Sequence, residues 1–532
     1  MQAETATATP TPAGSAAKGA VLRWLDRIGE RANPILVRIV RQELRSRAFI
    51  GVFAVLLVAA LIASIVVGTF SDQADEGMAA RGLFGVLAWA WWFALVVVQP
   101  TVTFLTVANE RNEDTWDLVE LTGMRPRRVL AGLLTASVVQ SILYTSALAP
   151  FMLLSYLLRG LDLGTIVIVL LLVPLHGIAA STLAAFCACL GNNKATRALL
   201  AVILIIGLVM LWLGTASMFF SLHTLHRIGI EVDVRRWTAE VWAAVGAYLN
   251  GWAAFVATML VLSSALLTFR AADRSGGPRL LWYALWANAL AWVLIADRID
   301  AGDELGEFLA VFGFGGMLWA MCLGLFSLSE DFELSPRQAR AITAPNRWLR
   351  PFTWLLGPGA ARGRWAYLVL ASLSLAICGA GWLIEESTAR AIERYRIAEE
   401  AAIKGWALYC YAAIVFVICD RLYRGPLRAL FPTPPLRRGM TILAMAVIAL
   451  VPLLALVLID SSLVDSSAFA ALSPIGGMVL FDRDLGSSSG TYLLLSVVGI
   501  CATGVLLLEA SRLGIRTQRI VARDNERNPR AG

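Results

Sequence analysis

The residues best suited to chemistry or binding lie in a charged segment between 110 and 128. Acidic side chains cluster in its first part and arginines at its end, and Thr115 stands where a helix could begin, with Leu118 and Leu121 behind it on one face. Gly123 is suited to end this helix and Pro126 to begin the next. By composition alone, such a short charged helix could contact a partner or simply connect two elements. The candidate contact residues are Glu110, Arg111, Glu113, Thr115, Asp117, Leu118, Leu121 and Pro126.

Residues of the common catalytic and nucleotide-binding kinds are scarce. The string from Gly191 to Thr196 lacks the second glycine and the spacing of a phosphate-binding P-loop, so we expect no ATP hydrolysis by this chain and no bound cofactor. Of the three histidines, His223 and His226 have no carboxylate or thiol close enough in sequence for a convincing metal site. His176 follows Pro174, where a kink frees backbone carbonyls that the imidazole N–H could satisfy.

The composition indicates a polytopic membrane protein. Of 532 residues, 58% are hydrophobic and only 16% are charged, against about 25% charged in a soluble domain. The apolar residues are spread along the whole length, which excludes a soluble protein, a disordered chain and a single-span receptor. None of the seven cysteines lies in an expected outer loop, so we expect no disulfide framework.

Stretches without charge mark the expected membrane spans. A helix needs about 20 apolar residues to cross the hydrocarbon core. Because period-two alternation is missing, the expected fold is all-α with about 12 transmembrane helices, and a β-barrel is excluded. The stretches at 280–296 and 405–419 are short, so whether they cross fully is open. The stretches are 48–71, 82–109, 129–158, 163–193, 198–226, 241–269, 280–296, 308–329, 365–384, 405–419, 439–459 and 485–508.

The distribution of basic residues predicts the orientation. With the N-terminus inside, 34 of the 45 Lys and Arg residues fall on the cytoplasmic side, which follows the positive-inside rule. Both termini are therefore expected in the cytoplasm, with the chain in the inner (cytoplasmic) membrane. We attribute the net charge of +7 to this topology and expect contact with membrane lipids, not with nucleic acid.

An amphipathic helix is expected before the first span. Asn33 can cap it and Pro34 can occupy its first turn. Apolar residues from Ile35 to Val40 fall on one side, and Arg38, Arg41 and Arg45 fall mostly on the other. The segment is suited to lie on the inner leaflet. The alternative is an ordinary basic flank.

The charged segment resembles the cytoplasmic signature of ABC-2 type transporter permeases, the membrane-spanning subunits of one class of ABC transporter. The sequence departs from that signature at Asp114, Gly123 and Leu133. The resemblance implies a coupling helix that contacts a separate cytoplasmic ABC ATPase subunit, with export as the direction. The N-terminal basic segment is similar to that family's interfacial helix. The matching positions are Glu110, Arg111, Glu113, Thr115, Leu118, Thr122, Pro126 and Gly132.

The second half of the chain is interpreted as a degenerate copy of the first. Six expected spans precede about residue 275 and six follow, and Ser329–Arg340 has an acidic-then-Pro-Arg order similar to that of 110–128. A parallel repeat is one hypothesis; one permease unit with six accessory spans is the other. The chain is then either one subunit of a homodimer or of a pair with a second permease, or a fused permease. The expected regions are a disordered tail 1–32, a first unit 33–275, a second unit 276–511 and a basic tail 512–532.

Two other functions compete with the permease. A secondary transporter is disfavoured because the expected spans contain no ionisable residue to couple to an ion. A membrane enzyme acting on a lipid-linked substrate needs clustered outer-face carboxylates or histidines. The acidic residues at 297–307 follow a solvated, helix-like pattern without histidine.

Overall fold

The computed structural model divides into two compact units, 1–267 and 268–532, and each is described by itself. The residues that the structure describes are 46–70, 76–112, 126–158, 161–191, 193–215, 238–268, 273–299, 304–328, 330, 338, 355–388, 392–425, 430, 434–459, 473–475 and 485–527.

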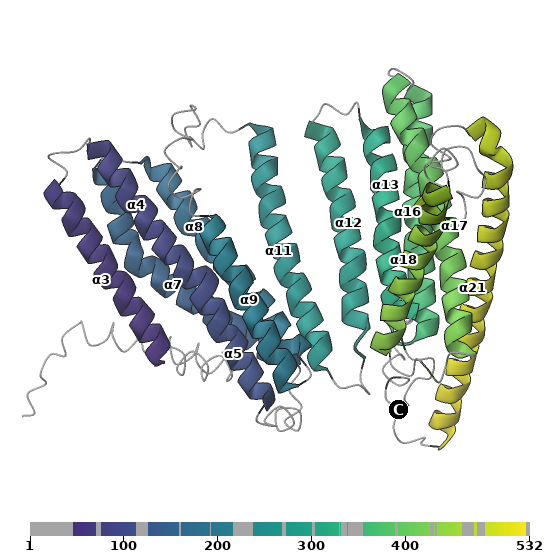
Figure 1. The fold of residues 1–532 in the computed structure, drawn as a ribbon, viewed down its shortest axis with the longest axis horizontal. Helices are drawn as coiled ribbons and strands as arrows, with labels where there is room; N and C mark the ends of the chain where they lie inside the picture. Colours follow the sequence, from purple (N-terminus) through teal and green to yellow (C-terminus); the bar gives the residue numbers. More distant parts are fainter. Residues whose placement is uncertain are drawn as a thin grey trace, which may run out of the picture. The chain divides into compact units, whose positions relative to one another are not determined.

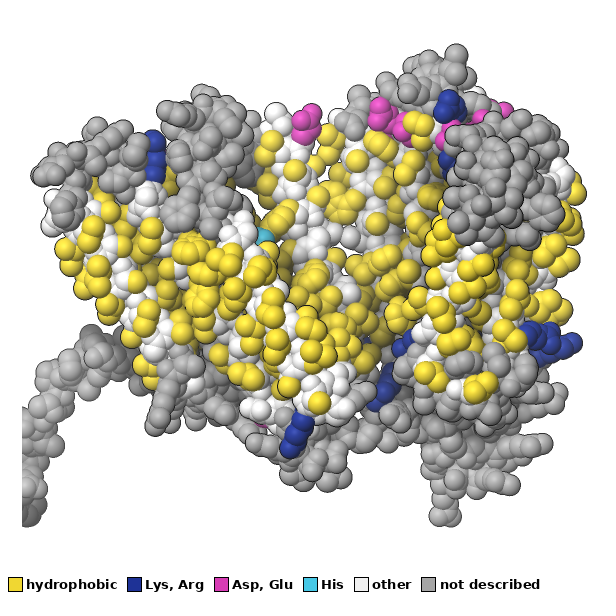
Figure 2. Space-filling view, in the orientation of Figure 1, with side chains coloured by type: hydrophobic (Ala, Val, Ile, Leu, Met, Phe, Trp, Pro, Cys, Tyr) yellow, Lys and Arg dark blue, Asp and Glu magenta, His cyan; other side chains and the backbone are white. Residues whose placement is uncertain are grey.

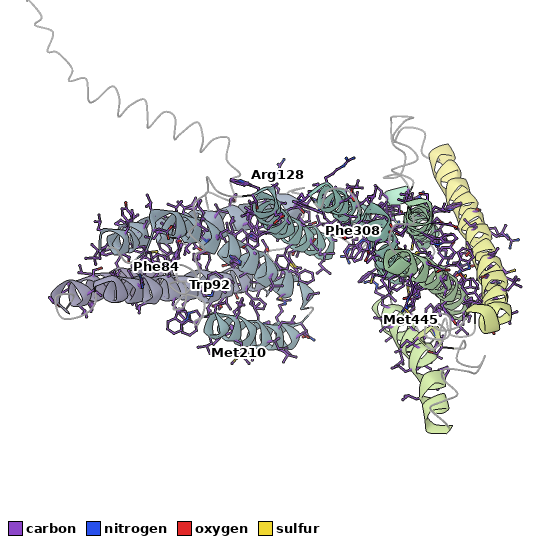
Figure 3. The ribbon with its side chains drawn as sticks, turned by 90° about the horizontal axis from the view of Figure 1, so that it is seen from above. Phe84, Trp92, Arg128, Met210, Phe308 and Met445 are labelled. Carbon is purple, nitrogen blue, oxygen red and sulfur yellow. The ribbon has the colours of Figure 1, made fainter. Side chains whose placement is uncertain are left out.

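The described part of the first unit contains six long helices (Figure 1). The second of them is continuous in three sections, α4, η2 and α5. Figure 3 looks down on these helices, with Phe84 and Trp92 labelled on α4. The six are α3 (Arg47–Phe70), α4 (Glu76–Phe93) with η2 (Ala94–Val98) and α5 (Gln99–Asn112), α7 (Pro126–Leu157), α8 (Leu163–Leu190), α9 (Lys194–Gly214) and α11 (Ala239–Leu267).

The π-helical section η2 has a local cause in Pro100. Proline has no N–H, and its ring clashes with the carbonyl four residues earlier, which here belongs to Val96. One widened turn removes the clash, and the backbone N–H of Gln99 bonds to the carbonyl of Ala94. The π turn therefore lets one helix continue through the proline.

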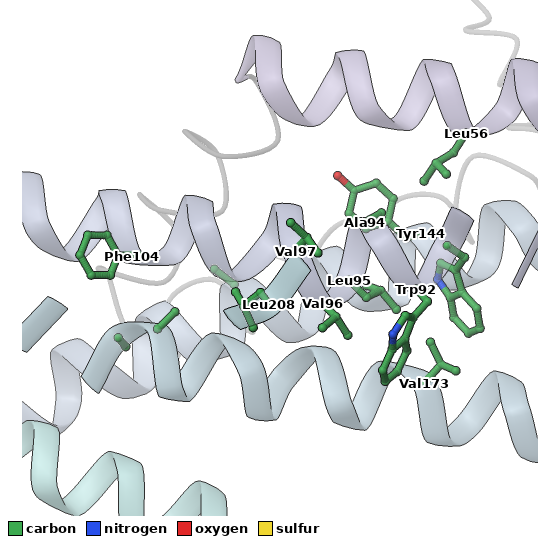
Figure 4. Packing of buried hydrophobic residues seen from close by; sticks show 14 of the residues in the cluster. Leu56, Trp92, Ala94, Leu95, Val96, Val97, Phe104, Tyr144, Val173 and Leu208 are labelled. Atoms are coloured by element: carbon green, nitrogen blue, oxygen red, sulfur yellow. The ribbon is translucent and has the colours of Figure 1, made fainter. Parts of the chain in front are cut away.

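The second helix is the centre of the first unit's core. Phe84, Trp91 and Leu95 are completely buried, and α3, α7, α8 and α9 all pack against the sections of this helix (Figure 4). By contrast, α3 and α9 keep broad apolar faces exposed, including Val55 and Ile203. An apolar surface of that extent suits contact with lipid.

The described part of the second unit also contains six long helices. The longest, α21, continues well past the apolar window that ends at Arg512. Its 43 residues correspond to about 65 Å at 1.5 Å per residue. The six are α12 (Gly276–Ile299), α13 (Leu305–Leu328), α16 (Ala360–Thr388), α17 (Ile392–Arg424), α18 (Pro434–Ile459) and α21 (Leu485–Arg527).

The helices α13 and α16 pack through small residues. A Cβ placed at Gly313 would lie under 3.0 Å from the backbone of Cys378, and one at Gly316 would lie that close to the side chain of Ser374. Gly381 makes an equally close approach to Ala310 from the other helix. Small residues allow the two helices to pack this closely. In a membrane the lipid tails are as apolar as the side chains, so close van der Waals packing, and not the hydrophobic effect, drives helices together.

The observed helices confirm the all-α, multi-pass expectation. Among the described residues, eleven helices are long and apolar enough to cross a membrane, and hydrophobic side chains cover much of the visible face of each unit in Figure 2. The short stretches at 280–296 and 405–419 belong to helices of 24 and 33 residues, so both are long enough to span.

Glycine at position 313 is expected to be required for stability. Gly313→Ala forces α13 and α16 apart, so we expect a loss of about 1–3 kcal/mol and a fall of several degrees in the thermal midpoint in detergent. Gly315 has no atom within 4 Å of its Cβ position. Gly315→Ala is the matched control and should leave the midpoint unchanged or raise it slightly. Equal midpoints for the two variants would contradict this packing.

Candidate functional site

The structure describes both ends of the charged segment. Glu110 and Arg111 lie in the last turn of α5, and α7 begins at Pro126 as the sequence predicts. We call the side of the first unit where α5 ends and α7 begins its basal side. The other candidate residues lie outside the described residues: Glu113, Thr115, Asp117, Leu118, Leu121, and the interfacial Arg38, Arg41 and Arg45.

Arg111 joins the end of α5 to the end of α8. Its Nη1 donates to the carbonyls of Ala188, Cys189 and Gly191, at 3.1, 2.8 and 3.0 Å. The last carbonyls of a helix have no partner within the helix, and the helix dipole makes that end negative. A guanidinium satisfies both conditions, so the segment that follows Arg111 starts from a fixed point.

A second arginine, Arg197, strengthens the same junction. It is 9% exposed, and it donates from Nε to the carbonyl of Gly191 at 3.1 Å and from Nη1 to that of Ala108 at 3.2 Å. A Cβ at Gly191 would overlap the Arg197 side chain, so glycine is needed there. The sequence pattern marked Arg197 only as a basic loop residue. The sequence did not reveal this role for two reasons. Both acceptors are backbone carbonyls, which no residue type marks, and that of Ala108 is 89 residues away in the chain.

The second unit contains a partly buried ionic cluster that joins the start of α16, the end of α17 and the interior of α21. Arg364 on α16 pairs with Asp420 on α17, and neither side chain is exposed. Arg424 bonds to Asp420 at 2.6 Å and to Glu509 of α21 at 3.3 Å. Arg421 completes the cluster by pairing with Glu509 at 2.8 Å.

This cluster places ionisable groups of α16 and α17 inside the helix bundle, next to the ends of the expected stretches 365–384 and 405–419. Arg364 directly precedes the expected stretch 365–384, and α16, which begins at Ala360, includes Arg364 in its second turn. Asp420 was assigned to a span end, but α17 continues to Arg424. A count of charge-free stretches treats each charged residue alone and therefore ends the stretch before it. Two opposite charges that pair with each other can nevertheless be buried within a helix bundle.

A further buried arginine holds the approach to α16. Arg279 of α12 pairs with Glu330 at 2.8 Å and donates to the carbonyls of Gly357 and Gly359. Glu330 in turn accepts from the backbone N–H of Gly359 at 2.9 Å. Gly359 has a φ of 104°, a conformation that favours glycine. The start of α16 is therefore fastened to α12.

A group of polar side chains in the first unit's core joins α5 to α7. Gln99 donates from Nε2 to the carbonyl of Ser137 at 2.9 Å and accepts at Oε1 from the Ser141 hydroxyl at 3.1 Å. The Thr103 hydroxyl lies 3.3 Å from that of Ser137. These bonds tie α5 to α7 without a charged group. Among the residues described, no three His, Cys, Asp or Glu side chains gather where they could hold a metal ion.

No family model, curated protein or solved structure matches this chain.

The ionic cluster yields a stability prediction. Asp420→Asn leaves Arg364 buried without its counter-charge and should cost about 3–5 kcal/mol, measured as a lower midpoint of thermal or denaturant unfolding. Replacing both partners, Arg364→Met with Asp420→Leu, should recover much of that loss. The control is Glu400→Gln, because Glu400 forms partly exposed pairs with Arg396 and Lys404 and should cost under about 1 kcal/mol. Equal effects of the Asp420 and Glu400 substitutions would refute the role of burial.

Proposed function

We propose that this chain is the membrane-spanning permease subunit of an ABC-2-like transporter, driven by a separate ATP-binding subunit. The observation that carries the proposal is the charged segment 110–126, whose pattern resembles the coupling helix of that family and whose first end is fastened by Arg111. A contact that transmits force must start from a rigid point. The arginine bonds at the basal ends of α5, α8 and α9 supply that rigidity.

The geometry suggests how movement of the segment reaches the membrane. ATP binding would close the partner's motor dimer and displace the 110–126 segment. Because Arg111 and Arg197 join the end of α5 to the end of α8 and the start of α9, these helices would move with it. The proposed consequence is a change in the pathway between helices, with export as the direction and with both chain termini in the cytoplasm.

The packing pattern within each unit supports a parallel repeat. In both units the second helix packs against the first, third, fourth and fifth. In both, the fourth helix also packs against the third, fifth and sixth, and the third packs against the sixth. Six unrelated accessory spans have no reason to follow this order. We therefore favour a fused permease with two ABC-2-like halves over one permease unit with added spans.

A secondary transporter remains the second candidate because of Asp420. A buried carboxylate is the group that proton- or ion-coupled carriers use, and its presence removes the main argument against that class. Asp420, however, is paired with two arginines and lies four residues from the end of α17. That arrangement suits a structural joint better than a coupling site. Transport that followed a proton gradient and ignored ATP would favour the carrier.

Complex formation tests the proposed permease. The chain should co-purify with an ABC ATPase encoded by an adjacent gene when the two are co-expressed. Glu113→Ala and Thr115→Ala should each weaken the complex by tenfold or more, because both change the segment that resembles the coupling helix. Glu240→Gln, in the first turn of α11, is the control and should bind as the native chain does. A native chain that retains no ATPase, or variants with unchanged binding and transport, would refute the proposal.

A further inference from the structure

The imidazole of His176 lies halfway along α8. It stands 13 residues after the first residue of that 28-residue helix, about 20 Å along its axis. In a membrane-spanning helix this is close to the middle of the bilayer. Its Nδ1 lies 2.9 Å from the carbonyl oxygen of Leu172, and its Nε2 lies 2.8 Å from the hydroxyl oxygen of Tyr248 on α11. The same hydroxyl oxygen lies farther from Nδ1, at 3.3 Å, so Leu172 is the nearer partner of Nδ1 and Tyr248 the partner of Nε2.

These two partners determine which hydrogen-bonding capacity is left. A carbonyl can only accept, so Nδ1 carries the proton and donates to Leu172. Nε2 then has the lone pair and accepts from the Tyr248 hydroxyl. Both donors of the pair are used, whereas the phenolic oxygen keeps a lone pair. The His176–Tyr248 pair can thus accept one further hydrogen bond from a ligand.

The surroundings of the pair are aromatic. The ring of Trp92 meets the imidazole edge-on, with centroids 5.3 Å apart, and Trp252 donates from Nε1 to the carbonyl of Leu175 at 2.6 Å. Beside Trp92, the rings of Trp89 and Trp212 are stacked at 4.2 Å. Flat aromatic faces of this kind bind aliphatic chains and rings.

The pair is accessible from the apolar surface. The Tyr248 side chain is 39% exposed and His176 is half-buried. A polar group that faces hydrocarbon costs free energy unless a partner satisfies it, and in membrane proteins such residues mark functional sites.

We propose that the His176–Tyr248 pair binds an amphiphile, a molecule with a long apolar body and a hydroxyl or N–H donor that bonds to the Tyr248 oxygen. The site takes a donor because the pair offers an acceptor, and it takes an apolar body because aromatic and aliphatic side chains surround it. Midplane sites are where transporters bind their cargo. The amphiphile is therefore the transported substrate, an assignment that rests on the proposed permease function.

Photolabelling tests the site. The full chain in phosphatidylcholine nanodiscs is exposed to a 16-carbon alcohol bearing a diazirine, and in parallel to its methyl ether and to the matching alkane. The alcohol should label the α8 and α11 peptides about three- to tenfold more than the ether, since one hydrogen bond in a membrane has that value. Tyr248→Phe and His176→Leu should both remove the preference. Equal labelling by alcohol and ether would overturn the proposal.

A matched control separates this site from general lipid contact. Tyr156 on α7 is also exposed, at 47%, so Tyr156→Phe should leave the labelling of α8 and α11 unchanged. A preference that survives Tyr248→Phe would overturn the proposal, because that variant keeps the aromatic ring and removes only the acceptor. The labelling experiment needs no ATPase, so its result is independent of the co-purification result. If the chain retains no ATPase but the alcohol labels it preferentially, the permease proposal alone is refuted. ATPase binding without preferential labelling refutes the amphiphile site alone.

Discussion

Every backbone and side-chain polar group in this chain must find a partner within the protein wherever hydrocarbon surrounds it. The rest of the structure depends on that constraint. It explains why the described residues form long helices and why Pro100 widens one turn without breaking a helix. It also explains why the carbonyls at the end of α8 are covered by Arg111 and Arg197.

The two units meet this constraint in different ways at the ends of their helices. In the first unit, guanidinium groups bond to helix-end carbonyls, so the charges are held by dipoles. In the second, Arg364 and Asp420 neutralise each other inside the bundle, and Arg279 with Glu330 holds the start of α16. The order of helix neighbours is nevertheless shared by both units. A common packing order with different polar chemistry is what an early duplication followed by divergence would leave, as the proposed repeat requires.

Much of the fold could be predicted from the sequence because a span is a local property. Charge-free stretches located the helices, and the proline pattern predicted the start of α7 at Pro126. The imidazole of His176 bonds to a carbonyl of its own helix, but this is the carbonyl of Leu172 and not that of Leu170, which Pro174 leaves without a donor. The contacts of the candidate site could not be predicted in this way. The acceptors of Arg111 lie about 80 residues away, and Tyr248 is 72 residues from His176. No rule of sequence spacing connects residues that far apart. A matching family could have indicated which distant residues act together, but no family model matches this chain.

By itself, the sequence determined that the chain is an all-α, multi-pass membrane protein and where most of its helices lie, because hydrophobicity over about 20 residues is sufficient for that. Only the tertiary structure decided which charges enter the bundle. Arg364 and Asp420 are buried because each neutralises the other, and a pair interaction of this kind cannot be read from either residue's own surroundings in the chain. The same holds for the accepting His176–Tyr248 pair, which exists only because α8 and α11 pack together.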